Sequence, residues 1–350
     1  MKAHRQSFLL AAVIFLLAVQ PAGSQETPVL TVGEDCPAMA WSPDGSRVAY
    51  AVKRVIHWRD WDKQRDDIGW VDLRGKRKRI LDGQKKVPDR AEFSYSIRSL
   101  AWSPDGRALL AEMLTSDDKT LTMLITDEGK DVRIGDKDDN IVQGFSAAWL
   151  GDNETVAFLI EVVKPRLLFK IAGVRIRGGR GLDFFPTKSF AAVAWDEKQR
   201  LAVAVQREKD FQGSPKLVLL RLDRESSLEL ADLADGFLGS LRISPSGKLA
   251  GYFVDQGTFE IRDLAAPQTA RRVKVPFGRY VWAPDEQRIL LQLPEGKRGG
   301  RLVWVDLRDG KTTPLLHSVV VRDFALSPNG RHLAITHNRE VRSLAIYSLP

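Results

Sequence analysis

The chain has 350 residues, a formal net charge of +8 and a single cysteine, Cys36. One cysteine excludes an intramolecular disulfide, and a chain of this length can bury a large core without one. Beyond the N-terminus no apolar run approaches the roughly 20 residues of a membrane-spanning helix.

The N-terminus predicts a secretory signal peptide over residues 1–24. Lys2 and Arg5 form a basic start, an apolar run extends from Phe8 to Val19, and Ala22-Gly-Ser24 resembles a cleavage site. An uncleaved membrane anchor is the alternative. We therefore expect an exported, periplasmic or extracellular chain over residues 25–350, with no integral membrane span after cleavage.

A repeated strand-and-turn motif occupies the rest of the chain. Its clearest copies are Met39-Ala-Trp-Ser-Pro-Asp-Gly45 and Leu100-Ala-Trp-Ser-Pro-Asp-Gly106. Proline sets φ for a turn, Asp bonds the local backbone and Gly supplies a positive φ, so each copy predicts a strand that ends in a tight turn. The bulky residues before the turns anchor repeats 1 to 7: Trp41, Trp102, Trp149, Trp195, Ile243, Trp282 and Leu326.

The spacing of the anchors indicates a propeller. Neighbouring anchors are 39 to 48 residues apart, except for 61 between the first two, and a four-stranded blade takes about 40–45 residues. Repeats 3 and 4 keep the strand but lose the turn residues. The seventh repeat ends after its third strand, so Pro28–Val32 is expected to supply the fourth. The sequence predicts an all-β fold, a single seven-bladed β-propeller of four-stranded blades closed by this N-terminal strand.

The repeats resemble those of the TolB-like propellers, also called WD40-like PD40 repeats, most clearly over Trp41–Tyr50 and Trp102–Ala111. The resemblance covers the mature chain and implies an exported propeller. The family includes periplasmic scaffolds that bind envelope proteins and propellers appended to serine peptidases. Seven repeats, where TolB itself has six blades, and no α/β domain before Pro28 indicate a TolB-like propeller other than TolB.

Two long loops on the face opposite the turns form the first candidate site. They span residues 53–67 and 83–96, belong to repeat 1 and its junction with repeat 2, and are expected to be neighbours. Interfaces favour aromatic and arginine side chains as anchors. The predicted binding residues are His57, Trp58, Arg59, Trp61, Arg65, Lys85, Lys86, Arg90, Phe93 and Tyr95. The alternative is that Trp58 and Trp61 form a small core under their own loop.

Four further residues are predicted near the channel mouth: Arg98, Arg279, Arg322 and Asp323. This assignment depends on strand register, because a one-residue slip moves a side chain to the other face. The basic segment 74–86 predicts either a patch for an acidic partner or an edge strand whose charges prevent sheet aggregation.

Catalytic and metal motifs are weak. The chain has no G-x-S-x-G elbow, and His332 and His337 are five apart in one extended segment, on opposite faces. The segment Asp136–Asn140 lacks the glycine and glutamate of a calcium loop. We expect no metal and no cofactor. The predicted function is a noncatalytic scaffold for another envelope protein or an acidic ligand, with no nucleic acid; a hydrolase or lyase acting on a sugar or small ester at the channel mouth is the alternative.

Overall fold

The computed structural model describes residues 27–58, 61–83, 94–129, 141–163, 168–176, 181–196, 198, 200–207, 214–234, 239–295, 299–316, 319–338 and 342–349. All regular elements in these ranges are β-strands, β1 to β30. Within them no helix has the length and apolar character needed to cross a membrane. The predicted signal peptide lies outside the described residues.

Antiparallel pairing joins the strands into four-stranded groups that follow the sequence repeats. Repeat 1 comprises β2 (Met39–Trp41), β3 (Arg47–Val52), β6 (Asp67–Asp72) and β7 (Arg77–Leu81). Repeat 2 comprises β8 (Tyr95–Trp102), β9 (Ala108–Thr115), β10 (Thr120–Thr126) and β11 (Ile141–Gln143). Repeat 3 comprises β12 (Phe145–Trp149), β13 (Thr155–Val163), β14 (Leu168–Arg175) and β15 (Gly181–Phe184). Repeat 4 comprises β16 (Ser189–Asp196), β17 (Leu201–Arg207), β18 (Lys216–Arg221) and β19 (Ser226–Asp232).

The remaining repeats continue the pattern. Repeat 5 comprises β20 (Gly239–Ile243), β21 (Leu249–Asp255), β22 (Thr258–Asp263) and β23 (Ala270–Lys274). Repeat 6 comprises β24 (Arg279–Trp282), β25 (Arg288–Pro294), β26 (Gly300–Asp306) and β27 (Thr312–Pro314). Repeat 7 comprises β28 (Val321–Leu326), β29 (His332–Asn338) and β30 (Arg342–Ser348). Repeats 3 and 4, and repeats 6 and 7, also share one residue pair each, Phe169 with Phe190 and Gly300 with Val321.

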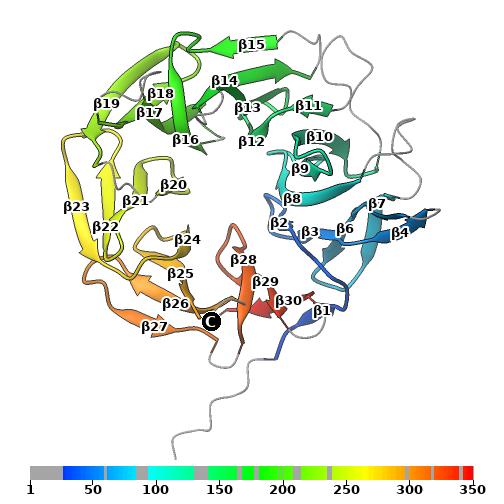
Figure 1. The fold of residues 1–350 in the computed structure, drawn as a ribbon. Helices are drawn as coiled ribbons and strands as arrows, with labels where there is room; N and C mark the ends of the chain where they lie inside the picture. Colours follow the sequence, from blue (N-terminus) through cyan, green and yellow to red (C-terminus); the bar gives the residue numbers. More distant parts are fainter. Residues whose placement is uncertain are drawn as a thin grey trace, which may run out of the picture.

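The repeats follow one another around a ring in chain order (Figure 1). β1 (Leu30–Val32) lies beside β30, with Val32 opposite Leu344 and Leu30 opposite Ile346. Because successive strands are antiparallel, the turns after the first and third strands of each repeat lie on one face, which we call the turn face. The connections after the second and fourth strands lie on the opposite face, the loop face.

The apolar core lies between neighbouring repeats. One buried cluster occupies each junction: that between repeats 1 and 2 contains Trp70 and Trp102, and that between repeats 5 and 6 contains Phe253 and Tyr280. The cluster between repeats 7 and 1 includes the fully buried Val32 of β1. Apolar side chains on both faces of the middle strands therefore pack against the next sheet, as the continuous apolar runs in the sequence require.

The turns have the backbone that their residues predict. Gly45 and Gly106 have φ of 68° and 69°, and the Gly45 N–H donates to the Ser42 carbonyl. Repeat 3, which lacks the Ser-Pro-Asp-Gly sequence, nevertheless reverses in the same way. Its Leu150 N–H donates to the Thr155 carbonyl at 2.9 Å, as Ser42 donates to Arg47 in repeat 1. Repeat 3 therefore lacks the usual turn residues, but its backbone still forms the turn.

Anchor tryptophans link neighbouring repeats through the backbone. Four of the five anchor tryptophans donate their indole N–H to a carbonyl of the innermost strand of the preceding repeat, whereas the Trp149 Nε1 has no partner among the described residues. The bonds are Trp41 to Ala325 (2.9 Å), Trp102 to Ala40 (3.1 Å), Trp195 to Ser146 (2.7 Å) and Trp282 to Arg242 (3.4 Å). These bonds fix how closely successive innermost strands approach each other.

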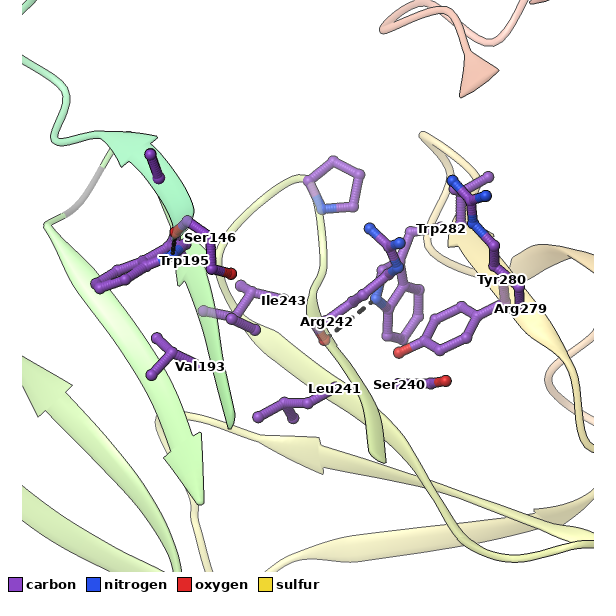
Figure 2. Close-up of a pocket in the computed structure, with 15 residues that line it drawn as sticks. Ser146, Val193, Trp195, Ser240, Leu241, Arg242, Ile243, Arg279, Tyr280 and Trp282 are labelled. Carbon is purple, nitrogen blue, oxygen red and sulfur yellow. Dashed lines mark hydrogen bonds between the residues drawn. The ribbon is translucent and has the colours of Figure 1, made fainter. Parts of the chain in front are cut away.

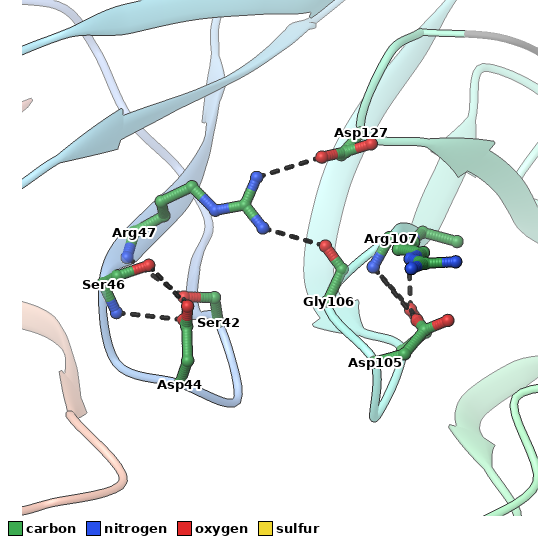
Figure 3. A network of polar contacts seen from close by, with 10 residues as sticks. Ser42, Asp44, Ser46, Arg47, Asp105, Gly106, Arg107 and Asp127 are labelled. Carbon is green, nitrogen blue, oxygen red and sulfur yellow. Dashed lines mark hydrogen bonds and ion pairs between the residues drawn. The ribbon is translucent and has the colours of Figure 1, made fainter.

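Arg47 makes a second link between repeats 1 and 2 (Figure 3). Its guanidinium donates to the Gly106 carbonyl at 2.9 Å and to the Asp127 carboxylate at 3.0 Å. The same group lies 4.8 Å from the centre of the Trp102 ring and 5.3 Å from that of Trp70. A turn-face arginine thus joins a turn, a carboxylate and two rings in one junction.

Substitution of Val32 by Asp tests the contact between the two ends of the chain. Val32 is fully buried in the cluster between repeats 7 and 1, whereas Val29 is 54% exposed. Burying a carboxylate there should lower the free energy of unfolding by about 3 kcal/mol and speed amide exchange in β30 and β2 together. Val29→Asp should change it by less than about 0.5 kcal/mol. Equal effects of the two substitutions in denaturant unfolding would contradict this packing.

Candidate functional site

The long connection within repeat 1 forms a β-hairpin. β4 (Val55–Trp58) and β5 (Trp61–Gln64) pair antiparallel, with Trp58 opposite Trp61 and His57 opposite Asp62. The sequence predicted a loop here, so the pairing is a feature that sequence reasoning missed. The described strand β4 reaches the outer edge of the ring (Figure 1). The hairpin is therefore a protrusion of the loop face at the rim.

Asp66 holds the base of the hairpin against repeat 2. This fully buried carboxylate accepts a hydrogen bond from the Ile97 N–H at 2.8 Å and one from the Gln64 amide at 3.0 Å. Burial raises the pKa of the Asp66 carboxyl, and these two hydrogen bonds act in the opposite direction. The Ser94 hydroxyl adds a bond to the Gln64 carbonyl at 2.9 Å. The segment between β5 and β6 is consequently fixed to the start of β8.

A second set of contacts holds the hairpin to repeat 1. Arg54, just before β4, donates to the Asp67 carboxylate at 3.0 Å and to Glu34 at 2.9 Å. Asp67 is 3% exposed and also accepts the Gly83 N–H at 2.9 Å. The two consecutive buried carboxylates therefore anchor the hairpin, Asp66 to Ile97 of repeat 2 and Asp67 to Arg54 and Gly83 of repeat 1.

Tyr95 differs from its predicted role. Its side chain is 4% exposed within the core between repeats 1 and 2, and its hydroxyl donates to the Asp66 carbonyl at 3.2 Å. The Tyr95 ring packs in the core at the base of the hairpin instead of presenting a surface to a partner. The alternation of apolar and polar residues from Phe93 to Ile97 is the pattern of a half-buried strand and could have signalled this burial.

The other predicted loop residues are described to different extents. His57 is exposed and its ring Nδ1 lies 2.5 Å from Asp62, while Arg65 pairs with Tyr95 through a parallel bridge. The backbones of Trp58 and Trp61 are described, but not their side chains. Arg59, Lys85, Lys86, Arg90 and Phe93 lie outside the described residues. The structure thus places Arg65 beside Tyr95 at the junction of repeats 1 and 2, and His57 on the hairpin.

The predicted channel residues lie on the innermost strands: Arg98 directly follows Ile97 at the base of the hairpin, whereas Arg279, Arg322 and Asp323 belong to repeats 6 and 7. Arg279 of β24 forms an ion pair with Asp323 of β28 at 2.6 Å, and its guanidinium lies 5.5 Å from the Phe324 ring centre. Arg98 and Arg322 both occupy breaks in strand register, between Ile97 and Ser99 in β8 and between Val321 and Asp323 in β28. Arg98 is exposed and Arg322 half-buried. These β-bulges, which sequence alone could not locate, decide where the two arginines point.

A cavity of about 550 Å³ lies among the innermost strands of repeats 3 to 6 (Figure 2). Its polar lining comes from Ser146, Ser240, Arg242, Arg279 and Tyr280. The Tyr280 hydroxyl donates to the Gly251 carbonyl at 2.6 Å, and burial raises the pKa of this tyrosine. The described residues include no group of His, Cys, Asp or Glu side chains that could hold a metal ion.

Arg242 is the cavity residue that the sequence prediction omitted. A signal was present: the position directly before the anchor is Ala or Val in the other repeats and Arg only in repeat 5. The Arg242 side chain is exposed and lines the cavity. Removal from bulk water lowers the pKa of Arg242, and the charge of Arg279 acts in the same direction.

Comparisons with known proteins identify the fold. No protein-family model matches the chain, and no curated protein matches it in sequence. The β-propeller domain of Cps50 (Swd1) from Myceliophteria thermophila is similar in structure, with a TM-score of 0.63 and 14% identity over 93% of this chain and all of that one. A chain of the mitotic checkpoint complex has a TM-score of 0.60 and 13% identity, over 100% of this chain and 99% of that one. The chain is therefore an all-β, WD40-like β-propeller.

Replacement of Asp66 by Ala tests the anchoring of the hairpin. The change leaves the buried Ile97 N–H without its partner, which should cost about 2 kcal/mol of stability. Amide exchange over β5 and the start of β8 should quicken in the same variant. Asp62→Ala, at a side chain 66% exposed, is the matched control and should change stability by less than about 0.5 kcal/mol. Unchanged exchange at Ile97 in Asp66→Ala would contradict the anchoring role.

Proposed function

We propose that this chain is a noncatalytic binding propeller of seven blades, one for each repeat, and that β1 closes the ring as the outer strand of the last blade. Support comes from the pairing of β1 with β30 and from the buried cluster between repeats 7 and 1. The chain is exported to the bacterial periplasm or cell surface as a TolB-like propeller. The N-terminal sequence of residues 1–24 and the Ser-Pro-Asp-Gly repeats support this part of the proposal.

The binding surface is the loop face at repeats 1 and 2, and the hairpin is the observation that carries the proposal. Both of its ends are fixed by the buried carboxylates Asp66 and Asp67. A rigid protrusion loses little conformational entropy when a partner covers it. Two tryptophans at its tip, Trp58 and Trp61, are of the residue type that most often anchors protein interfaces.

The partner is an acidic protein of the envelope. Basic residues flank the hairpin in the sequence and on neighbouring strands, among them Lys53, Lys63, Arg65 and Arg98. The net charge of +8, which is +6 (8 − 2) without Lys2 and Arg5 of the signal peptide, has the sign that attracts such a partner over distances near the Debye length, about 8 Å at physiological ionic strength. Charges of this kind increase the rate of encounter, whereas the aromatic tip supplies the affinity.

A pull-down from envelope extract tests the proposal. The bait is the purified chain, and the test variant carries Trp58→Ala and Trp61→Ala. Removing two interface anchors should weaken capture at least tenfold, about 1.4 kcal/mol or more. Leu228→Ala, which removes a side chain 49% exposed on repeat 4, is the matched control and should retain the partner. The same captured proteins in equal amounts for all three baits would exclude the hairpin as the binding surface.

A further inference from the structure

The innermost strands contain one position that departs from the repeat. Directly before the anchor stand Ala40, Ala101, Ala148, Ala194, Arg242, Val281 and Ala325. The backbone carbonyl at this position accepts the indole hydrogen bond of the next repeat in three junctions, those of Ala40, Arg242 and Ala325. A small side chain leaves room for that indole, so the position has a physical reason to be Ala or Val.

Arg242 has to place a long cationic side chain where its counterparts have a methyl or isopropyl group. Its carbonyl still accepts the Trp282 N–H, at 3.4 Å, while the side chain projects beside the Trp282 and Tyr280 rings into the cavity (Figure 2). Among the residues directly before an anchor, only Arg242 brings a charge to the cavity. The substitution therefore indicates a role for the guanidinium in the cavity.

The charge of Arg242 is not balanced within the described part of the chain. No carboxylate there lies within ion-pair distance of its guanidinium, while the nearby Asp323 is engaged by Arg279 at 2.6 Å. An exposed guanidinium that lines a cavity and has no ion pair among the described residues is available to an anion that enters. Planar guanidinium groups bind carboxylates through two parallel hydrogen bonds.

Two serines complete the cavity wall from equivalent positions. Ser146 of repeat 3 and Ser240 of repeat 5 each stand three residues before their anchors, at register shifts, with φ of 53° and 58°. Both line the cavity with Arg242. A volume of about 550 Å³ is within the 300–1,000 Å³ range of small-molecule sites and exceeds what one water or halide ion would occupy.

We propose that this cavity is a binding site for a small polar carboxylate, with Arg242 holding the carboxylate and Ser146 and Ser240 supplying hydroxyl groups to the rest of the ligand. Arg279 also lines the site, and its charge is paired with Asp323. The site lies in repeats 3 to 6 and the hairpin at repeats 1 and 2, so this inference does not depend on the proposed protein partner.

Calorimetric titration of the full chain with succinate and its neutral diamide tests the proposal. Succinate should bind and raise the Tm by ligand linkage, and the diamide should do neither. Arg242→Gln should weaken succinate binding at least tenfold. Arg221→Gln, on the exposed end of β18, is the matched control and should bind like the wild type. If Arg242→Gln fails to fold, Arg242→Lys keeps the charge without the planar fork and should still lose affinity severalfold.

Two further probes separate the sources of the carboxylate. The first probe is a blocked diglutamyl peptide. If it binds and Arg242→Gln abolishes its binding, while succinate does not bind, the ligand is the acidic side chain of an inserted peptide. That result still supports a carboxylate site. Inorganic phosphate binding without either carboxylate would overturn the proposed ligand class. Succinate binding that is unchanged in Arg242→Gln, or no binding of any carboxylate, would overturn the site.

Discussion

The hydrogen bond from an anchor indole to the backbone of the preceding repeat is the contact on which the rest of the structure depends. It recurs from Trp41, Trp102, Trp195 and Trp282, and it fixes how closely the innermost strands approach. Among repeats 3 to 6 it joins two walls of the cavity, at Ser146 and at Arg242. Arg242 is informative because the residue directly before the anchor is Ala or Val in the other repeats.

Much of the fold could be predicted from the sequence because its information is local. Ser-Pro-Asp-Gly sets the turn at Gly45 and Gly106 through a positive φ, and apolar runs such as 48–52 predict strands buried on both sides. The repeat 3 turn was missed because backbone closure at Leu150 survives without the usual residues. Closure depends on the backbone hydrogen bond, which several sequences can form.

The candidate sites were harder to predict because they depend on contacts between repeats. Nothing local marks residues 55–64 as a hairpin, since its order comes from Asp66 reaching Ile97 in the next repeat. The same contact buries Tyr95, which sequence reasoning placed at the surface. β-Bulges at Arg98 and Arg322 change the strand register, and the register decides where these two side chains point. Long-range anchoring and register, unlike turns, are not encoded in a short motif.

The central proposal is that the chain acts by binding a protein through the hairpin on its loop face. Photo-crosslinking in the native cell tests it directly, with a photoreactive residue at Asp62 on β5 or at Arg308 in the β26–β27 turn on the opposite face. Both side chains are well exposed, at 66% and 73%. The account predicts a discrete crosslinked protein from position 62 and none from position 308. Crosslinks from position 308 alone, or the same product from both positions, would contradict it.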